Sequence, residues 1–107
     1  MNTASMKLIT IFAEHVLKDR LISDLLRLGA TGYSAGDVEG VGNRGTPIAW
    51  QGPNVRIETI VPPAVADRIL AALENDYLRD YAVVVWVGTV EVLRPEKFSG
   101  PTPRRTP

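Results

Sequence analysis

The chain has 107 residues, of which 45% are apolar and 22% charged, and this composition is typical of one ordinary globular domain. Its 12 basic and 12 acidic residues cancel, so we expect neither nucleic-acid binding nor attraction to an anionic membrane. Cysteine is absent, which excludes disulfides and thiolate metal sites, and the lack of a long apolar run or a signal-peptide pattern predicts a cytoplasmic protein without membrane insertion.

The first part of the chain predicts a strand, a helix and a second strand. Met6–Phe12 is a β-branched, apolar run of strand length. From Ala13 the apolar residues recur at helical spacing, and Gly29 is well placed just past the end of that helix. Tyr33–Val41 is predicted as the second strand. The side chains expected on the buried stripe of the helix are those of Val16, Leu17, Leu21, Ile22, Leu25, Leu26 and Leu28.

The second part predicts a strand, a helix and a final strand. Val55–Val61 alternates as a strand does, which places Thr59 on one face and Glu58 on the other. Pro62-Pro63 fits the start of a second helix, which we expect to unwind near residues 76–80. Ala82–Leu93 is the strongest predicted strand. The expected buried stripe of the second helix consists of Val65, Ala66, Ile69, Leu70, Leu73 and Tyr77.

The predicted element order is β-α-β-β-α-β. This order is that of an α+β, ferredoxin-like fold, in which both helices cover one face of a four-stranded antiparallel sheet. Ala82–Val87 is apolar on both faces of its strand, although one sheet face would have no helix to cover it. Since so small a chain has no third layer, we expect that face to be covered by further copies of the chain.

Gly32–Gly45 is the most unusual stretch, with five glycines in fourteen residues. Within it, Gly40–Gly45 matches the dinucleotide-binding pattern GxGxxG, but no helix follows and the chain is too short for that fold. Successive glycine amides can instead form an anion site, or they can simply permit a strand bulge. A segment with two prolines, Thr46–Asn54, follows and predicts an irregular loop.

Three segments resemble the PII signalling proteins, over about residues 6–101. They are Gly32-Tyr33-Ser34, Val38-Glu39-Gly40-Val41-Gly42 and Val55-Arg56-Ile57-Glu58. The C-terminal run Phe98-Ser99-Gly100-Pro101 is similar to the carbon-related branch of that family, the SbtB-like and carboxysome-associated PII proteins. The resemblance implies one PII-like domain over residues 1–101, with a T-loop at about 43–54 and a flexible tail at 102–107.

The resemblance also implies a function and a set of partners. PII-like proteins of this branch are regulatory homotrimers, not enzymes, that bind adenine nucleotides in clefts between subunits and carry no tightly bound cofactor. AMP or ADP, and less readily ATP or cyclic AMP, with bicarbonate, are the expected effectors. A bicarbonate transporter or a carboxysome-associated protein of the carbon concentrating mechanism is the expected partner.

The resemblance assigns roles to two groups of residues. The nucleotide-binding group is Ser34, Gly40, Val41, Gly42, Arg94 and Lys97. The bicarbonate or T-loop group is Asn43, Arg44, Gly45 and Trp50, in which the Arg44 fork suits an oxyanion and Trp50 suits a partner contact.

Some departures from the family pattern bear on these roles. Glu96 occupies the second basic position of the C-terminal pattern, and Glu74–Asp80 replaces a lysine-bearing loop that grips phosphates. A highly charged triphosphate is therefore less well accommodated. Two alternatives stay open, namely slow nucleotide hydrolysis at the same cleft and a structural trimer without a nucleotide. Because His15 is the lone histidine, no metal site is expected, and we find no catalytic set of residues.

Overall fold

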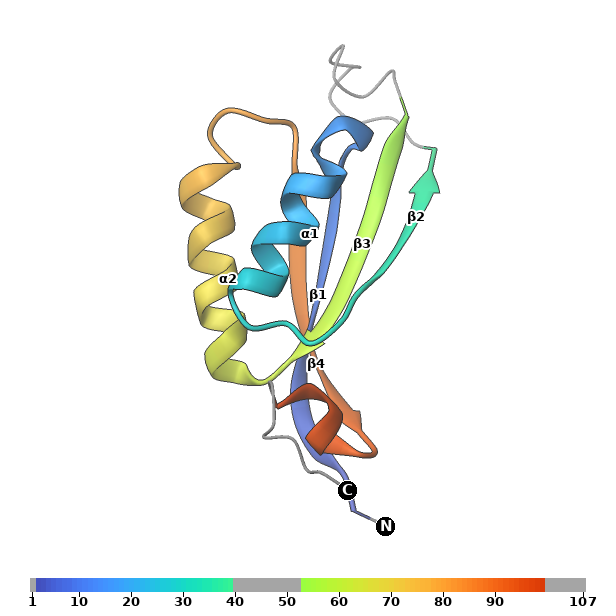
Figure 1. Ribbon diagram of the computed structural model, residues 1–107, viewed down its shortest axis with the longest axis vertical. Helices are drawn as coiled ribbons and strands as arrows, with labels where there is room; N and C mark the ends of the chain where they lie inside the picture. The colour runs from blue at the N-terminus through green and yellow to red at the C-terminus, as the bar shows by residue number, and fades with distance from the viewer. Residues whose placement is uncertain (1, 40–52, 100–107) are drawn as a thin grey trace.

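The computed structural model describes residues 2–39 and 53–99, and it contains four strands, two α-helices and two short 3₁₀ turns within those ranges (Figure 1). In chain order the elements are β1 (Ala4–Glu14), η1 (His15–Leu17), α1 (Lys18–Arg27), β2 (Ser34–Val38), β3 (Asn54–Val61), α2 (Pro63–Asp76), β4 (Val84–Val92) and η3 (Pro95–Phe98). The predicted β-α-β-β-α-β order is confirmed.

The four strands form one antiparallel sheet in the order β2-β3-β1-β4. Both α-helices lie on the same face of this sheet (Figure 1), so the predicted ferredoxin-like architecture is confirmed. The register places Thr10 of β1 opposite Glu58 of β3 and opposite Trp86 of β4. Ser34, the first residue of β2, lies opposite Glu58 on the other side of β3.

The hydrophobic core lies between the sheet and the two helices. Alternate residues of β1 and β3 point into it, as the alternation of Val55–Val61 predicted, and the fully buried Tyr77 closes it beyond the end of α2. The cluster comprises Ile9, Ile11, Ala13, Leu17, Leu21, Leu25, Ala30, Val55, Ile57, Val61, Val65, Ala66, Ile69, Leu73 and Tyr77. No helix in the described ranges is long and apolar enough to cross a membrane.

The first helix begins later than the apolar spacing predicts. Strand β1 continues to Glu14, and a 3₁₀ turn then precedes α1. Because three residues per turn rotate the side chains differently from an α-helix, Leu17 is buried while Val16 is 81% exposed. The prediction that Val16 belongs to the buried stripe was therefore wrong. The prediction for Leu26 was also wrong: Leu26 follows Leu25 within α1, so it points to another side of the helix and is 46% exposed, and the stripe is carried by Leu21 and Leu25, four residues apart.

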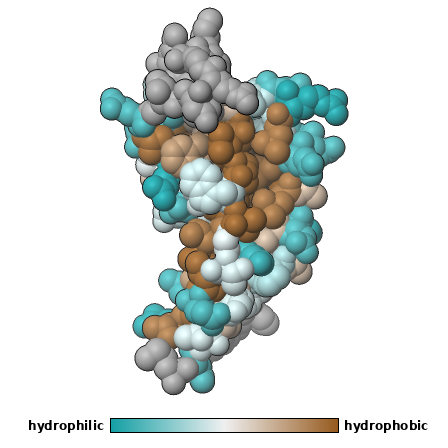
Figure 2. All heavy atoms as spheres, turned by 180° about the vertical axis from the view of Figure 1, so that it is seen from behind, coloured by the Kyte–Doolittle hydropathy of each residue, from teal (hydrophilic) through white to brown (hydrophobic). Residues whose placement is uncertain are grey.

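The sheet face turned away from the helices carries large apolar side chains at the β1–β4 edge. Trp86 is 49% exposed and packs against Phe12 of β1, with 5.2 Å between the ring centroids. Val84, also exposed, lies opposite Phe12 in the register. Figure 2 shows brown, apolar surface across this side of the molecule. Apolar side chains gathered on a sheet face that none of the described helices covers are typical of a subunit contact.

Candidate functional site

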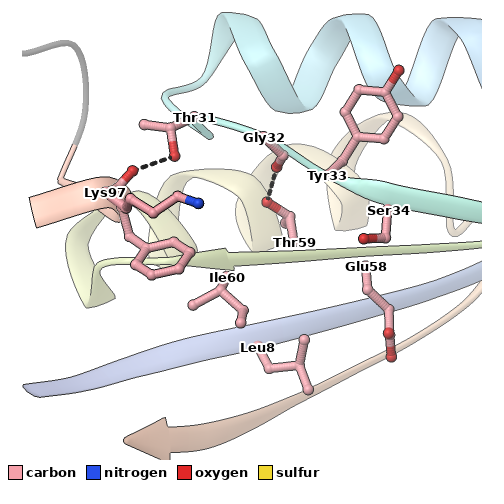
Figure 3. Close-up of a pocket in the computed structure, with 10 residues that line it drawn as sticks. Leu8, Thr31, Gly32, Tyr33, Ser34, Glu58, Thr59, Ile60 and Lys97 are labelled. Atoms are coloured by element: carbon pink, nitrogen blue, oxygen red, sulfur yellow. Dashed lines mark hydrogen bonds between the residues drawn. The ribbon is translucent and has the colours of Figure 1, made fainter. Parts of the chain in front are cut away.

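A cavity of about 410 Å³ opens where the segment before β2 meets β3, β1 and the C-terminal turn η3 (Figure 3). Its walls come from four separate parts of the chain. The lining residues are Leu8 of β1, Thr31, Gly32, Tyr33 and Ser34 at the start of β2, Glu58, Thr59 and Ile60 of β3, and Lys97 and Phe98 of η3.

Two threonine hydroxyls fix the loop that forms one wall of this cavity. The buried Thr59 donates a hydrogen bond from Oγ1 to the carbonyl oxygen of Gly32 at 2.7 Å. Thr31 donates from Oγ1 to the carbonyl oxygen of Lys97 at 2.9 Å. The loop is therefore attached to β3 on one side and to η3 on the other, and this places Ser34 and Lys97 around one space (Figure 3).

Arg94 makes the turn that brings η3 to the cavity. Its backbone is left-handed, with φ 56° and ψ 59°, a conformation that is uncommon outside glycine. Pro95 then begins the 3₁₀ turn that contains Lys97. The side chain of Arg94 does not line the cavity of its own chain, whereas Lys97 does.

Glu58 is held in place at the edge of the cavity by two donors. Its Oε2 accepts a hydrogen bond from Arg56 Nη2 at 2.9 Å and another from Thr10 Oγ1 at 3.0 Å. Both bonds favour the ionised carboxylate, so the Arg56 guanidinium first and the Thr10 hydroxyl second lower the pKa of Glu58 below its usual range. The cavity thus carries a fixed negative charge at neutral pH.

The cavity has two polar ends and an apolar middle. In Figure 3, Lys97 and Glu58 lie toward opposite ends, with Ile60 and Leu8 between them. Such a lining suits a ligand that has an apolar ring and polar groups on either side of it. The described residues include no group of three or more histidine, cysteine, aspartate or glutamate side chains that could hold a metal ion.

Of the residues assigned from the sequence, the structure brings Ser34 and Lys97 to this cavity. The others assigned to the nucleotide, bicarbonate or T-loop lie outside the described residues, apart from Arg94: they are Gly40, Val41, Gly42, Asn43, Arg44, Gly45 and Trp50. Leu8, Glu58 and Ile60 received no role from the sequence. The strand alternation places Glu58 and Ile60 on one face, but which strands flank them is a matter of tertiary pairing.

The fold defines an α+β domain of the ferredoxin-like class. The family model described as "Nitrogen regulatory protein P-II" matches residues 6–97, and the chain therefore belongs to the P-II family. A comparison with curated protein sequences returned no match.

Solved structures with the same fold agree with this family. A PII-like signaling protein of Thermus thermophilus is 44% identical, with a TM-score of 0.79, 92% of this chain and 99% of that chain being covered. CPII of Thiomonas intermedia, solved with ADP, AMP and bicarbonate, is 23% identical with a TM-score of 0.81, covering 92% of this chain and 98% of its own. A second CPII structure, with ADP, AMP and acetate, is 22% identical with a TM-score of 0.82. The match covers 94% of this chain and 100% of that CPII chain.

Proposed function

We propose that this chain is a PII-like regulatory protein that binds adenine nucleotides and senses bicarbonate. The observation that carries the proposal is the cavity at the start of β2, in a chain of the P-II family whose fold is shared with CPII bound to ADP, AMP and bicarbonate. AMP and ADP are the preferred ligands in this proposal, because the described walls of the cavity carry a carboxylate and only one lysine.

The nucleotide is proposed to lie along the start of β2. The base contacts the apolar Leu8 and Ile60 beside Ser34, and the phosphates extend along β2 toward the glycines that follow it, Gly40 and Gly42. Lys97 lies at the other end of the cavity (Figure 3), so its charge, like that of Arg94, would reach those phosphates only from a neighbouring subunit.

The proposed assembly is a homotrimer in which the open sheet face of each subunit contacts the others. Covering this face would remove Phe12, Val84 and Trp86 from water, and apolar burial of that kind is the main driving force of stable association. The nucleotide clefts then lie between subunits, which supplies the second chain that Arg94 and Lys97 require.

The proposed output is the segment of about residues 43–54, which contains Asn43, Arg44, Gly45 and Trp50. A nucleotide, with or without bicarbonate, can change partner binding only if its affinity differs between two states of this segment. The partner is proposed to act in inorganic-carbon uptake or fixation.

The test is calorimetric titration of the purified protein with AMP, ADP, ATP and cyclic AMP, each with and without bicarbonate. We expect saturable binding of AMP or ADP near one nucleotide per chain, with an affinity that bicarbonate changes. Binding that ignores bicarbonate would remove the carbon-specific part of the proposal. Absence of binding by every nucleotide would favour a purely structural oligomer.

The same samples distinguish a regulator from a hydrolase. Incubation of ADP with the protein and Mg²⁺, followed by chromatography of the nucleotides, should return ADP unchanged if the chain is only a sensor. Steady production of AMP and phosphate would instead establish slow hydrolysis at the cleft.

A further inference from the structure

The carboxylate of Glu58 uses only one of its two oxygens within the described part of the chain. Thr10 Oγ1 and Arg56 Nη2 both donate to Oε2, at 3.0 Å and 2.9 Å. None of the described residues donates a hydrogen bond to Oε1. The Glu58 side chain is 30% exposed and lines the cavity, so the unused oxygen belongs to a group that a ligand can reach.

An ionised carboxylate can only accept hydrogen bonds. The two donors on Oε2 fix the position of the group and favour its charged form, so it does not become a donor at neutral pH. A neutral ligand group that bonds to Glu58 must therefore carry a hydrogen-bond donor. A phosphate oxygen, which is anionic, would be repelled from the same place.

The position of Glu58 identifies which part of a nucleotide meets it. Ile60 lies two residues further along the same face of β3, and Leu8 of β1 lies directly opposite Ile60, so the apolar surface for a base is next to Glu58. Ser34 faces Glu58 across the β2–β3 pair. The group attached directly to the base is the sugar, and its vicinal hydroxyls are donors.

We propose that Glu58 accepts a hydrogen bond from a sugar hydroxyl of the bound nucleotide and that the site thereby selects ribonucleotides over analogues that lack the 2′ or the 3′ hydroxyl. This inference rests on the proposed nucleotide binding and assigns a specificity-determining residue to that site. A site that bonds a hydroxyl rejects the analogue without it, since the partly buried acceptor is then left without its partner.

Thr10 is a positioning residue in this proposal. Its side chain is fully buried beside Glu58 and Trp86, so it cannot touch the ligand, but its hydroxyl holds Glu58 Oε2. Thr10→Val keeps the shape of the side chain and removes this donor. Thr10→Ser keeps the donor.

The experiment compares AMP, 2′-deoxy-AMP and 3′-deoxy-AMP by calorimetric titration of the full chain. For the wild-type protein we expect at least one deoxy analogue to bind about tenfold or more weakly than AMP, as for the loss of one hydrogen bond to a charged group. In Glu58→Ala the ratio of the affinity for AMP to the affinity for that deoxy analogue should fall to about twofold or less. Thr10→Val should reduce the ratio and Thr10→Ser should restore it.

The outcomes separate this inference from the proposed function. If the wild-type protein binds no adenine nucleotide, the proposed function fails and this inference fails with it. If it binds AMP and both deoxy analogues equally well, nucleotide binding stands and the role of Glu58 is overturned. The wild-type comparison needs no variant, and circular dichroism with light scattering shows whether Glu58→Ala keeps the fold and assembly.

Discussion

Tyr77 is the residue at which the two helices are joined by a polar contact inside the core. Its side chain is 1% exposed, and its hydroxyl donates to Asp24 Oδ2 of α1 at 2.5 Å. The Arg20 guanidinium stacks 4.6 Å above its ring. Burial first, and the bond to Asp24 second, raise the pKa of Tyr77 well above its ordinary value of 10.

The substitution Tyr77→Phe should lower the free energy of unfolding by about 1–2 kcal/mol, because it leaves a partly buried carboxylate without its donor. The substitution should also weaken the dependence of the free energy of unfolding on pH in the alkaline range. In the wild-type protein Tyr77 loses its proton above pH 10 in the unfolded state but keeps it when folded, so stability falls as the pH rises through that region. Denaturant titrations at several values of pH would measure both effects.

Tyr81 provides the matched control for this prediction. Its hydroxyl accepts a weak bond of 3.3 Å from Arg20 Nη1 at the surface. Tyr81→Phe should change the free energy of unfolding by less than about 0.5 kcal/mol. Equal losses in the two variants would show that the bond to Asp24 does not stabilise the fold.

At this scale the sequence predicts only part of the candidate site. Ser34 and Lys97 were assigned from the resemblance, and both line the cavity. The environment of Glu58 could not be predicted, because Thr10 and Ser34 meet it through the register of strands 24 or more residues away in the chain. Alternation gives the face on which a side chain lies but not its neighbours across the sheet.

Helix α1 reaches the loop before β2 through a turn that only glycine fits well. Gly29 has φ +121°, and a Cβ there would lie 3.1 Å from Arg68 Nη2 and 3.2 Å from Val65 Cγ1 of α2. Arg68 also donates from Nε to the carbonyl oxygen of Leu28 at 3.3 Å. The end of α1 is thus packed closely on α2 at the point where the chain turns toward the cavity.

Gly29→Ala should destabilise the fold by about 1–3 kcal/mol, through the positive φ and the close contacts with α2. Gly36→Ala in β2 is the control, since a Cβ there meets no atom within 4 Å and alanine costs less entropy in a strand. Thermal unfolding at one fixed protein concentration measures both. If the Gly29→Ala protein were as stable as the Gly36→Ala protein, a side chain at residue 29 would not be strained.

The helices and strands could be predicted where the sequence pattern that indicates them lies within the element itself. The period change after β1, Pro62-Pro63 and the apolar β4 predict the β-α-β-β-α-β order, and Asn75-Asp76 with Arg79-Asp80 predicts the end of α2 near Asp76. The 3₁₀ turn η1 was not predicted, because Val16 and Leu17 fit a helical spacing as well as a turn. A hydrogen bond from His15 N to the carbonyl oxygen of Pro53, at 2.9 Å, lies beside this turn, and so distant a contact has no local signal.

The described residues form a two-layer structure in which no helix or strand covers the second face of the sheet. On that face the aromatic pair of Phe12 and Trp86 lies beside the ion pair of Arg56 and Glu58. The same strands therefore supply the proposed subunit contact and one wall of the cavity. Assembly and ligand binding should consequently be linked, because the proposed cleft is complete only between subunits.

Trp86→Glu is the substitution that tests this link. A carboxylate in place of Trp86 would have to be desolvated in any contact made by this face, so we expect light scattering to show loss of the trimer and calorimetry to show loss of nucleotide binding. Val16→Glu is the control, because Val16 is more exposed than Trp86 but lies in η1 and not in the sheet. This variant should keep the mass of the trimer and should still bind nucleotide. A Trp86→Glu protein with wild-type mass would show that subunits associate through another surface, and a monomer that still binds nucleotide would place the whole site within one chain.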